Sequence, residues 1–539
     1  MHLGGHGVRP DDRGPSFVSW AAKAVWEGDH KLRPMPATDA STDPTTDHVD
    51  VLIVGAGLSG VGAAVHLVTA QNTTQNQNTT QNPAGSHRSY AILEARDAIG
   101  GTWDQFRYPG VRSDSDMFTL GYRFRPWTGD KALADGPSIL EYVRATAREY
   151  GVDEQIRYGH RVVGADWSSA QQRWTVRVDR DGEQVTLTCN VLWACSGYYD
   201  YDRGFRPEFE AIEDYEGTLI HPQHWPEDLD YSDKQVVVIG SGATAVTLVP
   251  AMAIEAAHVT MLQRSPTYIL SLPSNDPLAE RLRARLPAMA AYGITRWKNV
   301  LVATGIYQLS QRRPNLVRGL IRRANMSLLP EGYDVDTHFK PRYDPWDQRL
   351  CLIPDGDLFK AIRKGTASVV TDRIERFTPK GVLLESGEEL QADIVVTATG
   401  LNLLAFGGAE LSLDGEPVSM PDTMAYKGMM LSGVPNFVFT VGYTNASWTL
   451  KADLVSEYLI RILRHLDSTG TTVFEPRRDP AVGAEPFLDF AAGYVLRSVD
   501  DFPRQGDRAP WRLRQNYLRD VFSIRHGKVT DDAMTFSGR

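Results

Sequence analysis

Short apolar runs that end at glycine-rich turns are the main pattern of this chain. VDVLIV precedes a turn at Gly55, and KQVVVI precedes a turn at Gly240. Each turn opens a longer, mostly apolar stretch, so both regions predict a strand, a tight turn and a helix. Alternating residues over 173–188 predict a β-hairpin with Asp181-Gly182 at its turn. Together these elements predict an α/β fold with two Rossmann-like dinucleotide-binding domains.

The two turns have the glycine spacing of dinucleotide-binding fingerprints, GAGLSG over 55–60 and GSGATA over 240–245. A strand that runs into such a turn places helix-terminal N–H groups where they bind a pyrophosphate. One match is weak, but two in the right context indicate two nucleotide sites. The cofactor-binding residues predicted here are Gly55, Gly57, Ser59, Gly60, Gly240, Ser241, Gly242, Ala243, Thr244, Ala245 and Val246.

The residue that ends the next strand differs between the two halves. SYAILEA contains Glu94, whose carboxylate suits the ribose hydroxyls of FAD. HVTMLQRSP contains Arg264 and Ser265, and Arg264 lies 22 residues after Gly242. An arginine binds a ribose 2′-phosphate, whereas a carboxylate repels it. We therefore expect FAD in the first half and NADPH in the second. The alternative for Arg264 is a solvated strand end.

A polar tract interrupts the first half. Glu94 lies 37 residues after Gly57, whereas the usual distance is about 20. The tract QNTTQNQNTTQ over 71–81 accounts for the excess. Because a surface loop accepts an insertion at small entropic cost, we expect a solvated loop here.

The segment GGTWDQFRYPGVRSDSDMF, over 100–118, combines paired glycines, aromatic residues and both charge signs. Paired glycines let a backbone approach a ligand closely. Loops of this composition beside a nucleotide fold are candidates for function, and the alternative is a purely structural loop. The cofactor-binding residues predicted here are Thr102, Trp103, Asp104, Gln105, Arg112, Ser113 and Asp114, together with Val162.

Composition limits the class of protein. The chain has 539 residues, 42% of them apolar, which is typical of globular proteins. A formal charge of −10 argues against broad nucleic-acid binding. No apolar run spans a bilayer, and the N-terminus lacks the apolar core of a secretory signal. Three cysteines suit a reducing cytoplasm, and we expect Cys189 and Cys195 to be buried small residues.

A segment rich in basic residues follows the second fingerprint. Residues 276–330 contain three stretches with helical character, and their basic residues far outnumber the acidic ones. We expect a helical insertion here. Its basic face either touches an acidic membrane peripherally or is simply solvated, and the sequence favours solvation.

Two further motifs carry a family resemblance. Gly217-x3-His221-x3-Trp225-Pro226 resembles the fingerprint of the Baeyer–Villiger monooxygenases, a family of class B flavin monooxygenases, with Tyr215 in place of the usual Phe. The segment from Gly100 to Asp114 resembles their second signature, and the similarity extends from residue 49 to about 530. Related flavin N- and S-oxygenases usually carry Tyr where this chain has Trp225.

The resemblance implies an activity and its cofactors. NADPH reduces bound FAD, O2 adds to the reduced flavin, and a ketone becomes an ester or lactone. Thioethers and thioamides are oxidised at sulfur instead. An essential arginine of the family corresponds to Arg349 and its carboxylate partner to Asp114. From sequence alone, Arg349 has the default role of a surface ion pair. Many relatives carry Lys where this chain has Gln348, which leaves Arg264 to bind the 2′-phosphate.

The linker histidine is expected to lock a hinge when NADPH binds, as the resemblance implies for His221. His221 and His224 have no third ligand at a suitable spacing, so we expect no metal site. Asn445, Ser447 and Trp448 precede an amphipathic helix and are predicted to line a substrate pocket.

Three other functions are the alternatives to a Baeyer–Villiger monooxygenase. One is a flavin S- or N-oxygenase without ketone insertion, and another is a non-catalytic dinucleotide-binding redox sensor. A disulfide reductase is disfavoured because paired redox cysteines are absent from the sequence. Natural substrate and oligomeric state stay open.

The expected domains follow the chain in six parts. They are a disordered N-terminal extension (1–47), the first part of the FAD-binding domain (48–214), a linker (215–229), the NADPH-binding domain (230–275 and 340–389), the helical insertion (276–339), and the second part of the FAD-binding domain with the C-terminal region (390–539).

Overall fold

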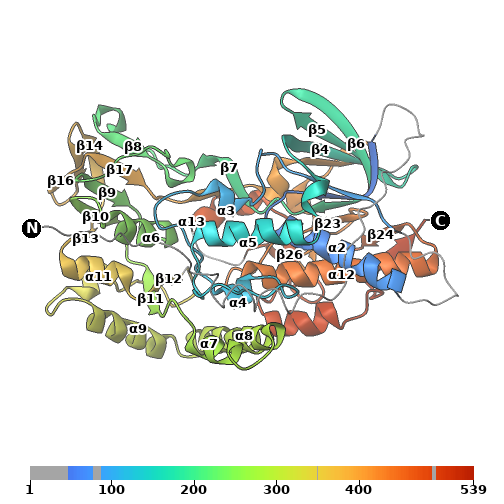
Figure 1. Cartoon of the computed structure of the whole chain (residues 1–539). Helices are drawn as coiled ribbons and strands as arrows, with labels where there is room; N and C mark the ends of the chain where they lie inside the picture. The colour runs from blue at the N-terminus through green and yellow to red at the C-terminus, as the bar shows by residue number, and fades with distance from the viewer. Residues whose placement is uncertain (1–46, 77–86, 349, 489–492, 539) are drawn as a thin grey trace, which may run out of the picture. The chain divides into compact units, whose positions relative to one another are not determined.

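A computed structural model describes residues 47–76, 87–348, 350–488 and 493–538. The expected N-terminal extension lies almost wholly outside these residues. Two separate sheets with parallel cores organise the described chain, and in Figure 1 they lie at opposite ends of the view. In each sheet, one strand runs directly into one of the two glycine-rich turns.

The first sheet has nine strands in the order β20-β19-β4-β5-β6-β1-β2-β3, and β23 also pairs with β6. Strands β23, β6, β1, β2 and β3 are parallel, as a Rossmann-like core requires. The predicted hairpin is confirmed as β5 and β6, with positive φ at Asp181 and Gly182. The bounds are β1 Asp47–Val54, β2 Tyr90–Leu93, β3 Ile156–Arg157, β4 His160–Ser168, β5 Arg173–Arg180, β6 Glu183–Ala194, β19 Glu410–Leu413, β20 Glu416–Pro417 and β23 Phe437–Phe439.

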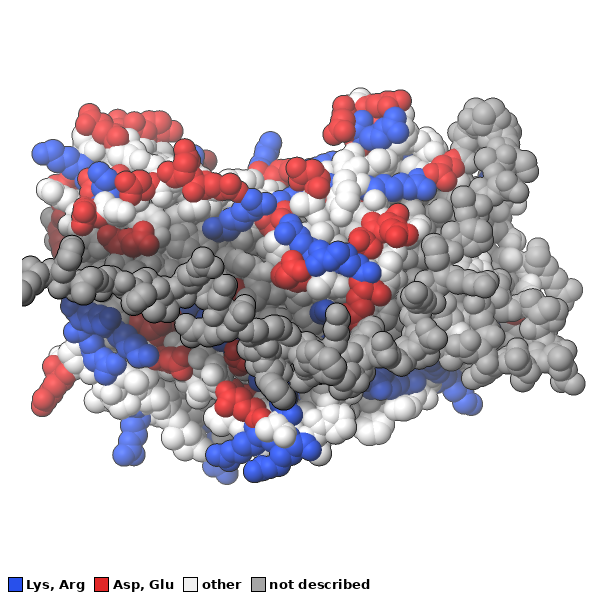
Figure 2. Space-filling model, viewed as in Figure 1, with Lys and Arg blue, Asp and Glu red and all other residues white. Residues whose placement is uncertain are grey.

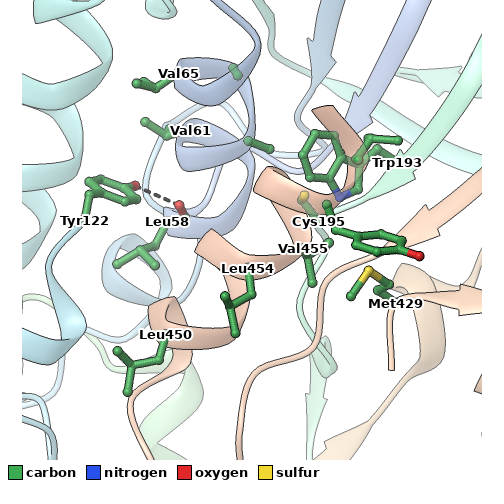
Figure 3. Packing of buried hydrophobic residues seen from close by; sticks show 14 of the residues in the cluster. Leu58, Val61, Val65, Tyr122, Trp193, Cys195, Met429, Leu450, Leu454 and Val455 are labelled. Carbon is green, nitrogen blue, oxygen red and sulfur yellow. Dashed lines mark hydrogen bonds between the residues drawn. The ribbon is translucent and has the colours of Figure 1, made fainter. Parts of the chain in front are cut away.

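Helices α2 (Leu58–Asn76) and α12 (Trp448–Thr469) pack against each other beside this sheet (Figure 1). Figure 3 shows buried apolar side chains of both helices, among them Val61 of α2 and Leu454 of α12, both fully buried. The Tyr122 hydroxyl donates to the Leu58 carbonyl at 2.7 Å and ties a neighbouring loop to the start of α2. Burial of each such aliphatic side chain contributes about 1.5–3 kcal/mol, so this contact holds the fingerprint helix in place.

The polar tract differs from the expected loop. Helix α2 continues to Asn76, so the first residues of the tract extend the helix. Gln and Asn have helix propensities close enough to those of neighbouring residues for this to happen. Residues 77–81 of the tract lie outside the described residues.

The second sheet has five parallel strands in the order β13-β10-β9-β17-β8. Helices α6 (Ala243–Met252) and α11 (Asp357–Lys364) contact each other beside it. Two strands lie outside the expected boundaries of the NADPH-binding domain: β8 falls in the expected linker, and β17 in the expected second part of the FAD-binding domain. The bounds are β8 Thr218–Ile220, β9 Gln235–Ile239, β10 His258–Gln263, β13 Ala367–Thr371 and β17 Ile394–Thr397.

Smaller sheets complete the described chain. A three-stranded antiparallel sheet of β14 (Ile374–Thr378), β15 (Gly381–Leu384) and β16 (Glu389–Gln391) precedes β17. Strand β7 (Tyr199–Gly204) pairs with β18 (Leu401–Leu403), and β11 (Tyr268–Leu272) with β12 (Leu350–Pro354). Short helices α3 (Thr102–Gln105) and α4 (Met117–Leu120) and the longer α5 (Gly136–Glu149) lie between β2 and β3.

Helices occupy the region of the expected insertion. They are α7 (Pro277–Arg283), α8 (Ala288–Arg312), α9 (Pro314–Leu328) and α10 (Val335–His338). Arg296 of α8 is buried and donates to the carbonyls of Phe118 and Gly121 and to the Asp453 carboxylate. This buried cation attaches the insertion to the first fold. No described helix is both long and apolar enough to cross a membrane.

Candidate active site

A cavity of about 570 Å³ lies at the start of α2 and extends to the start of α6. Its lining therefore comes from both fingerprint regions, which are almost 190 residues apart in sequence. Of the residues predicted to bind cofactor or substrate, those that line it are Gly55, Gly57, Ser59, Glu94, Thr102, Trp103, Gln105, Arg112, Ser113, Asp114, Val162, Ala243, Thr244 and Trp448.

The first glycine turn packs too closely for side chains. Gly55 has φ of +101°, and a Cβ there would lie 2.8 Å from the Cys195 carbonyl oxygen. A Cβ on Gly60 would lie 1.9 Å from the Gly55 oxygen, which explains why Gly60 packs beneath the turn and does not line the cavity. The turn thus brings backbone, rather than side chains, to the cavity wall, as a pyrophosphate site requires.

Glu94 closes this turn from the end of β2. Its carboxylate accepts hydrogen bonds from the N–H groups of Ala56 at 2.7 Å and Arg96 at 3.0 Å. Burial raises the pKa of Glu94, and these hydrogen bonds only partly offset that effect. A carboxylate with two oxygens and spare acceptor capacity at this position suits a ribose diol.

Asp104 has another role in the structure. Its carboxylate is 1% exposed and forms ion pairs with Arg96, Arg107 and Arg144 at 2.6, 3.4 and 3.2 Å. It does not line the cavity. Three cations around one buried carboxylate offset its desolvation, so the geometry assigns Asp104 to holding the loop in shape. Its predicted contact with cofactor is not supported by this placement.

Arg112 is the cationic side chain most deeply placed in the cavity wall. Its Nη1 donates to Asp357 of α11 at 2.5 Å, and the side chain is only 12% exposed. Its Nε and Nη2 atoms are buried and have no hydrogen-bond partner within the described residues. Burial raises the pKa of the Asp357 carboxyl, and Arg112 partly offsets this. Two orphaned donors at a cavity fit an anionic or carbonyl-rich ligand such as a dinucleotide.

Tyr108 bridges the two folds from the same loop. Burial raises its pKa to about 12, although a hydrogen bond with the Thr244 side chain lowers it. Thr244 belongs to the second fingerprint, at the start of α6. The loop over 100–114 therefore contacts the second fold at two places, through Tyr108 and through Arg112.

The second fingerprint has an open helix terminus. No side chain caps α6, and a Cβ on Gly242 would meet nothing within 4 Å. The Ser241 hydroxyl donates to the Ser265 carbonyl at 3.1 Å and fixes the turn to the end of β10. Arg264 beside it is exposed and has no ion-pair partner in the described parts of the chain. Uncapped N–H groups and a free guanidinium fit the pyrophosphate and 2′-phosphate of NADPH.

The remaining residues of this fingerprint lie behind the helix terminus. A Cβ on Gly240 would lie 2.4 Å from the Ala398 oxygen, so the turn packs tightly on the segment after β17. Ala245 and Val246 are fully buried on the side of α6 that faces the second sheet. They support the turn rather than reach a ligand.

Arg349 lies outside the described residues, so its predicted position stays a prediction. Strand β12 begins at the following residue, and Leu352 of that strand lines the cavity. Asp114, its predicted partner, also lines the cavity and is half-buried. Gln348 is half-buried and forms an isolated bridge with Pro345.

His221 joins the linker to the end of β17. Its Nε2 lies 3.1 Å from the Gly400 carbonyl oxygen, and its Nδ1 accepts from the Gln223 N–H at 3.2 Å. Burial lowers the pKa of His221. One acceptor nitrogen and one donor nitrogen define a neutral ring, so neither nitrogen is left for a metal. A Cβ on Gly204 would lie 2.1 Å from the ring, which encloses it further.

The other linker residues are packed. A Cβ on Gly217 would lie 2.7 Å from the Asp393 oxygen, so this position needs glycine beside the edge of the second sheet. Trp225 packs against the core of the second fold. Gln105 of the GGTWD loop donates to the Gln223 carbonyl at 3.0 Å, which places the two family-like motifs in direct contact.

The predicted pocket residues before α12 divide into two groups. The Trp448 indole N–H donates to the Ser59 hydroxyl at 2.7 Å and lines the cavity. Ser447 instead bonds Thr119 at 2.6 Å in a buried contact. Asn445 donates to the Gln515 carbonyl at 2.9 Å, and neither Ser447 nor Asn445 is part of the cavity lining.

Sequence reasoning missed the segment that follows β6. Tyr198, Tyr199 and Tyr201 line the cavity, as does Ser196, whose buried hydroxyl has no partner within the residues described. The Tyr201 hydroxyl lies 3.0 Å from that of Thr102, and burial raises its pKa to about 12. The signal that could have found them is the aromatic run YYDY over 198–201, which directly follows the apolar run VLWA and a small-residue turn.

Cys189 and Cys195 are buried and form no disulfide, as predicted. Burial raises the pKa of Cys195 to about 12, so its thiol is inert at neutral pH. A second cavity, of about 690 Å³, lies in the C-terminal region and contains none of the predicted site residues. Tyr443 lines both cavities.

Comparisons with known proteins concern the family and the fold of the chain. Residues 133–302 match a family described as flavin-binding monooxygenase-like. The FAD-containing monooxygenase EthA of Mycobacterium tuberculosis H37Rv is 58% identical over 496 residues, which cover 92% of this chain and 99% of that protein. The putative FAD-containing monooxygenase MymA of the same strain is 50% identical over 498 residues, covering 91% and 98%.

Solved structures are similar over nearly the whole chain. A steroid monooxygenase bound to NADP has a TM-score of 0.69 at 20% identity and covers 91% of this chain and 100% of its own. Cyclohexanone monooxygenase from Rhodococcus sp. Phi1, bound to NADP+, has a TM-score of 0.69 at 18% identity, covering 92% and 100%. At these identities the likeness concerns the fold, and it confirms the predicted fold class.

Proposed function

The chain belongs to the FAD-containing monooxygenases of the class B flavin type, and from this premise we propose that it inserts one oxygen atom from O2 into ketones. The products are esters or lactones, NADPH is the reductant, and thioethers and thioamides are oxidised at sulfur by the same site. The family membership rests on the 58% identity over 92% of the chain.

One observation carries the proposal beyond family membership. The first glycine turn, the GGTWD loop and the start of α6 line one cavity. A flavin held by the first fold and a nicotinamide cofactor held by the second would therefore share this cavity. That proximity is what electron transfer from NADPH to FAD requires.

Bound FAD, once reduced by NADPH, supplies the electrons that activate O2. The chain's own residues hold and shield that chemistry. Gly55 and Gly57 would present backbone to the FAD pyrophosphate, and Glu94 would accept hydrogen bonds from its ribose hydroxyls. The indole of Trp448, fixed by Ser59 and lying 5.1 Å from the Tyr198 ring, covers one side of the cavity and excludes water.

Positive charge in the cavity stabilises the negative charge that develops on oxygen during attack on a carbonyl. We assign this role to Arg349, oriented by Asp114, as the family resemblance implies. Arg112 supplies a second cation whose Nε and Nη2 donors are unpaired within the described residues. Because it is anchored to Asp357, it holds its position without a ligand.

We assign His221 the coupling of coenzyme binding to the linker. Its ring binds the Gly400 carbonyl, at the turn after β17, and the linker residue Gln223. NADPH on the second fold would therefore act on the linker through the turn after β17 to which the ring is hydrogen-bonded. If the His221→Ala enzyme oxygenates its substrate normally and binds coenzyme with unchanged affinity, this assignment is wrong.

The decisive experiment compares Arg349→Ala with Arg342→Ala. Arg342 is exposed, lies seven residues earlier in the sequence, and serves as the control for loss of a positive charge in that segment. With a methyl ketone, NADPH and O2, the wild type and Arg342→Ala should form the ester, detected by mass spectrometry. Arg349→Ala should still oxidise NADPH but form no ester. Ester formation by Arg349→Ala at the wild-type rate would refute the assignment.

The same assay separates the rival functions. A flavin S- or N-oxygenase would convert an aryl methyl sulfide to its sulfoxide and leave the ketone unchanged. Trp225, at the position where those enzymes usually have Tyr, favours ketone insertion. A non-catalytic sensor would bind FAD and NADPH without consuming O2.

A further inference from the structure

The charge of the helical insertion is one-sided. Residues 281–330 contain nine Arg and one Lys and no Asp or Glu. The whole chain carries −10, so the rest of it carries −20. Fifty consecutive residues without an acidic side chain are unusual for a solvated surface, where both signs normally alternate.

Apolar side chains are exposed on the same helices. Among the described residues, 16 large apolar side chains are exposed, and 12 of them lie between Leu278 and Met326. On α8, Ile294, Trp297 and Leu301 are 48%, 44% and 56% exposed and have the spacing of one helix face. On α9, Leu316 and Leu320 are 53% and 55% exposed. Contiguous apolar surface of this kind marks an interaction site.

The opposite side of α8 is firmly attached to the protein. Arg296 is buried against backbone carbonyls and Asp453, and the Tyr292 hydroxyl donates to the Tyr122 carbonyl at 3.0 Å. Thr295 is fully buried. The helix is therefore held by one face, while the apolar side chains project from the other face, away from the described residues on which α8 packs.

Several arginines of the insertion have no partner to neutralise them. Arg281, Arg285, Arg312, Arg313 and Arg323 are exposed and form no ion pair with any described residue. By contrast, Arg318 and Arg322 pair with Asp344 and Asp336. In Figure 2, Lys and Arg side chains project along the lower edge of the view, where Figure 1 shows α7, α8 and α9.

We propose that α8 and α9 form a docking surface for an anionic lipid bilayer. Exposed Trp, Leu and Ile side chains on one face, with arginines as the charged residues beside them, are the pattern of helices that lie in the membrane interface. The apolar side chains enter the headgroup region, and the arginines bind lipid phosphates. The rest of the chain has a formal charge of −20, so an anionic surface repels its other faces. The protein therefore binds the membrane in one orientation.

The surface is tested with the full-length, FAD-loaded protein and sedimented vesicles. Phosphatidylglycerol mixed with phosphatidylcholine should carry the protein into the pellet, and phosphatidylcholine alone should carry much less. Raising the salt from 0.1 M to 0.5 M should weaken but not abolish binding, because the apolar part is not screened.

Two double variants separate the charged and apolar contributions. Arg312→Gln with Arg313→Gln should lower partitioning to anionic vesicles about 25-fold, since each cation near such a surface contributes about fivefold. Leu301→Gln with Leu320→Gln should lower it at least tenfold. Ile254→Gln is the matched control, because Ile254 is 80% exposed but lies outside the insertion. It should bind as the wild type does, and all variants should keep wild-type NADPH oxidation in solution.

Either of two results would overturn the proposal. One is equal partitioning of the wild type and both double variants. The other result has two parts: the wild type does not bind vesicles, and it elutes from size exclusion as an oligomer that the Leu301→Gln, Leu320→Gln variant converts to a monomer. That second result would assign the surface to another copy of the chain.

Discussion

Loss of Arg264 gives a sharp test of which coenzyme the second fold selects. Arg264 follows β10 directly and lies in the loop that Ser241 fixes to the fingerprint turn through the Ser265 carbonyl. Its guanidinium is exposed and forms no ion pair with any residue that the structure describes. Arg264→Ala therefore removes no internal contact, and we expect its free energy of unfolding to stay within about 0.5 kcal/mol of the wild type.

The size of the binding effect follows from the same geometry. A hydrogen bond between a guanidinium and a phosphate contributes about 1.5–3 kcal/mol. Because Arg264 needs no rearrangement before it binds, the whole of this contribution should be lost. The dissociation constant for NADPH should therefore rise about 10- to 150-fold. NADH lacks the 2′-phosphate, so its affinity should not change.

Coenzyme affinity is measured by titration of the oxidised, FAD-loaded enzyme with NADP+ and NAD+, which avoids turnover. Arg363→Ala is the matched control, since Arg363 is an exposed arginine on α11 in the same fold. It should leave both affinities unchanged. An equal loss for NADP+ and NAD+ in Arg264→Ala would show that Arg264 does not read the phosphate. An equally large loss of NADP+ affinity in Arg363→Ala would show that the effect comes from positive charge in general and not from Arg264.

Two further results are expected. Arg112→Met should lower the free energy of unfolding, measured in urea, by about 2 kcal/mol, because it leaves the Asp357 carboxylate unpaired. The double variant Arg112→Met with Asp357→Asn should recover part of that loss. Strictly additive losses would show that the two side chains are not coupled. His221 has a pKa lowered by burial, so its contribution to stability is complete above the ordinary histidine pKa and is lost as pH falls through the lower, folded value. The difference in unfolding free energy between wild type and His221→Gln should thus shrink from pH 7.5 to pH 5, and a difference independent of pH would contradict the neutral ring bound to Gly400.

Sequence patterns could predict those parts of the site whose residues are close together along the chain. The glycine turn at Gly55 follows from the glycine spacing, and Glu94 follows from its place at the end of the apolar run SYAIL, because each motif is contiguous in the chain. Asp104 is different. Its partner Arg144 reaches it only because α5 packs beside α3, and no local signal distinguishes a carboxylate that binds a ligand from one that three arginines neutralise.

Two features depended on pairing across long distances. Strand β8 has three residues and no alternating pattern, and it is a strand because it covers the open edge of β17. The exposure of Leu301 could not be read from sequence either. Helical spacing indicates that an apolar face exists, whereas its burial depends on whether another element packs there. Arg349, the predicted catalytic arginine, remains a prediction from sequence.

The pairing of β23 with β6 has a consequence for synthesis of the protein. Phe437 lies beside Leu192 in the first sheet, yet roughly 240 residues separate the two strands in the chain. At about 5–20 residues per second, a ribosome needs on the order of 10–50 s to make that stretch. During this interval the nascent first fold has an open strand edge and no α12 to cover α2. Chaperone protection on the ribosome should therefore matter most while the second fold is being translated.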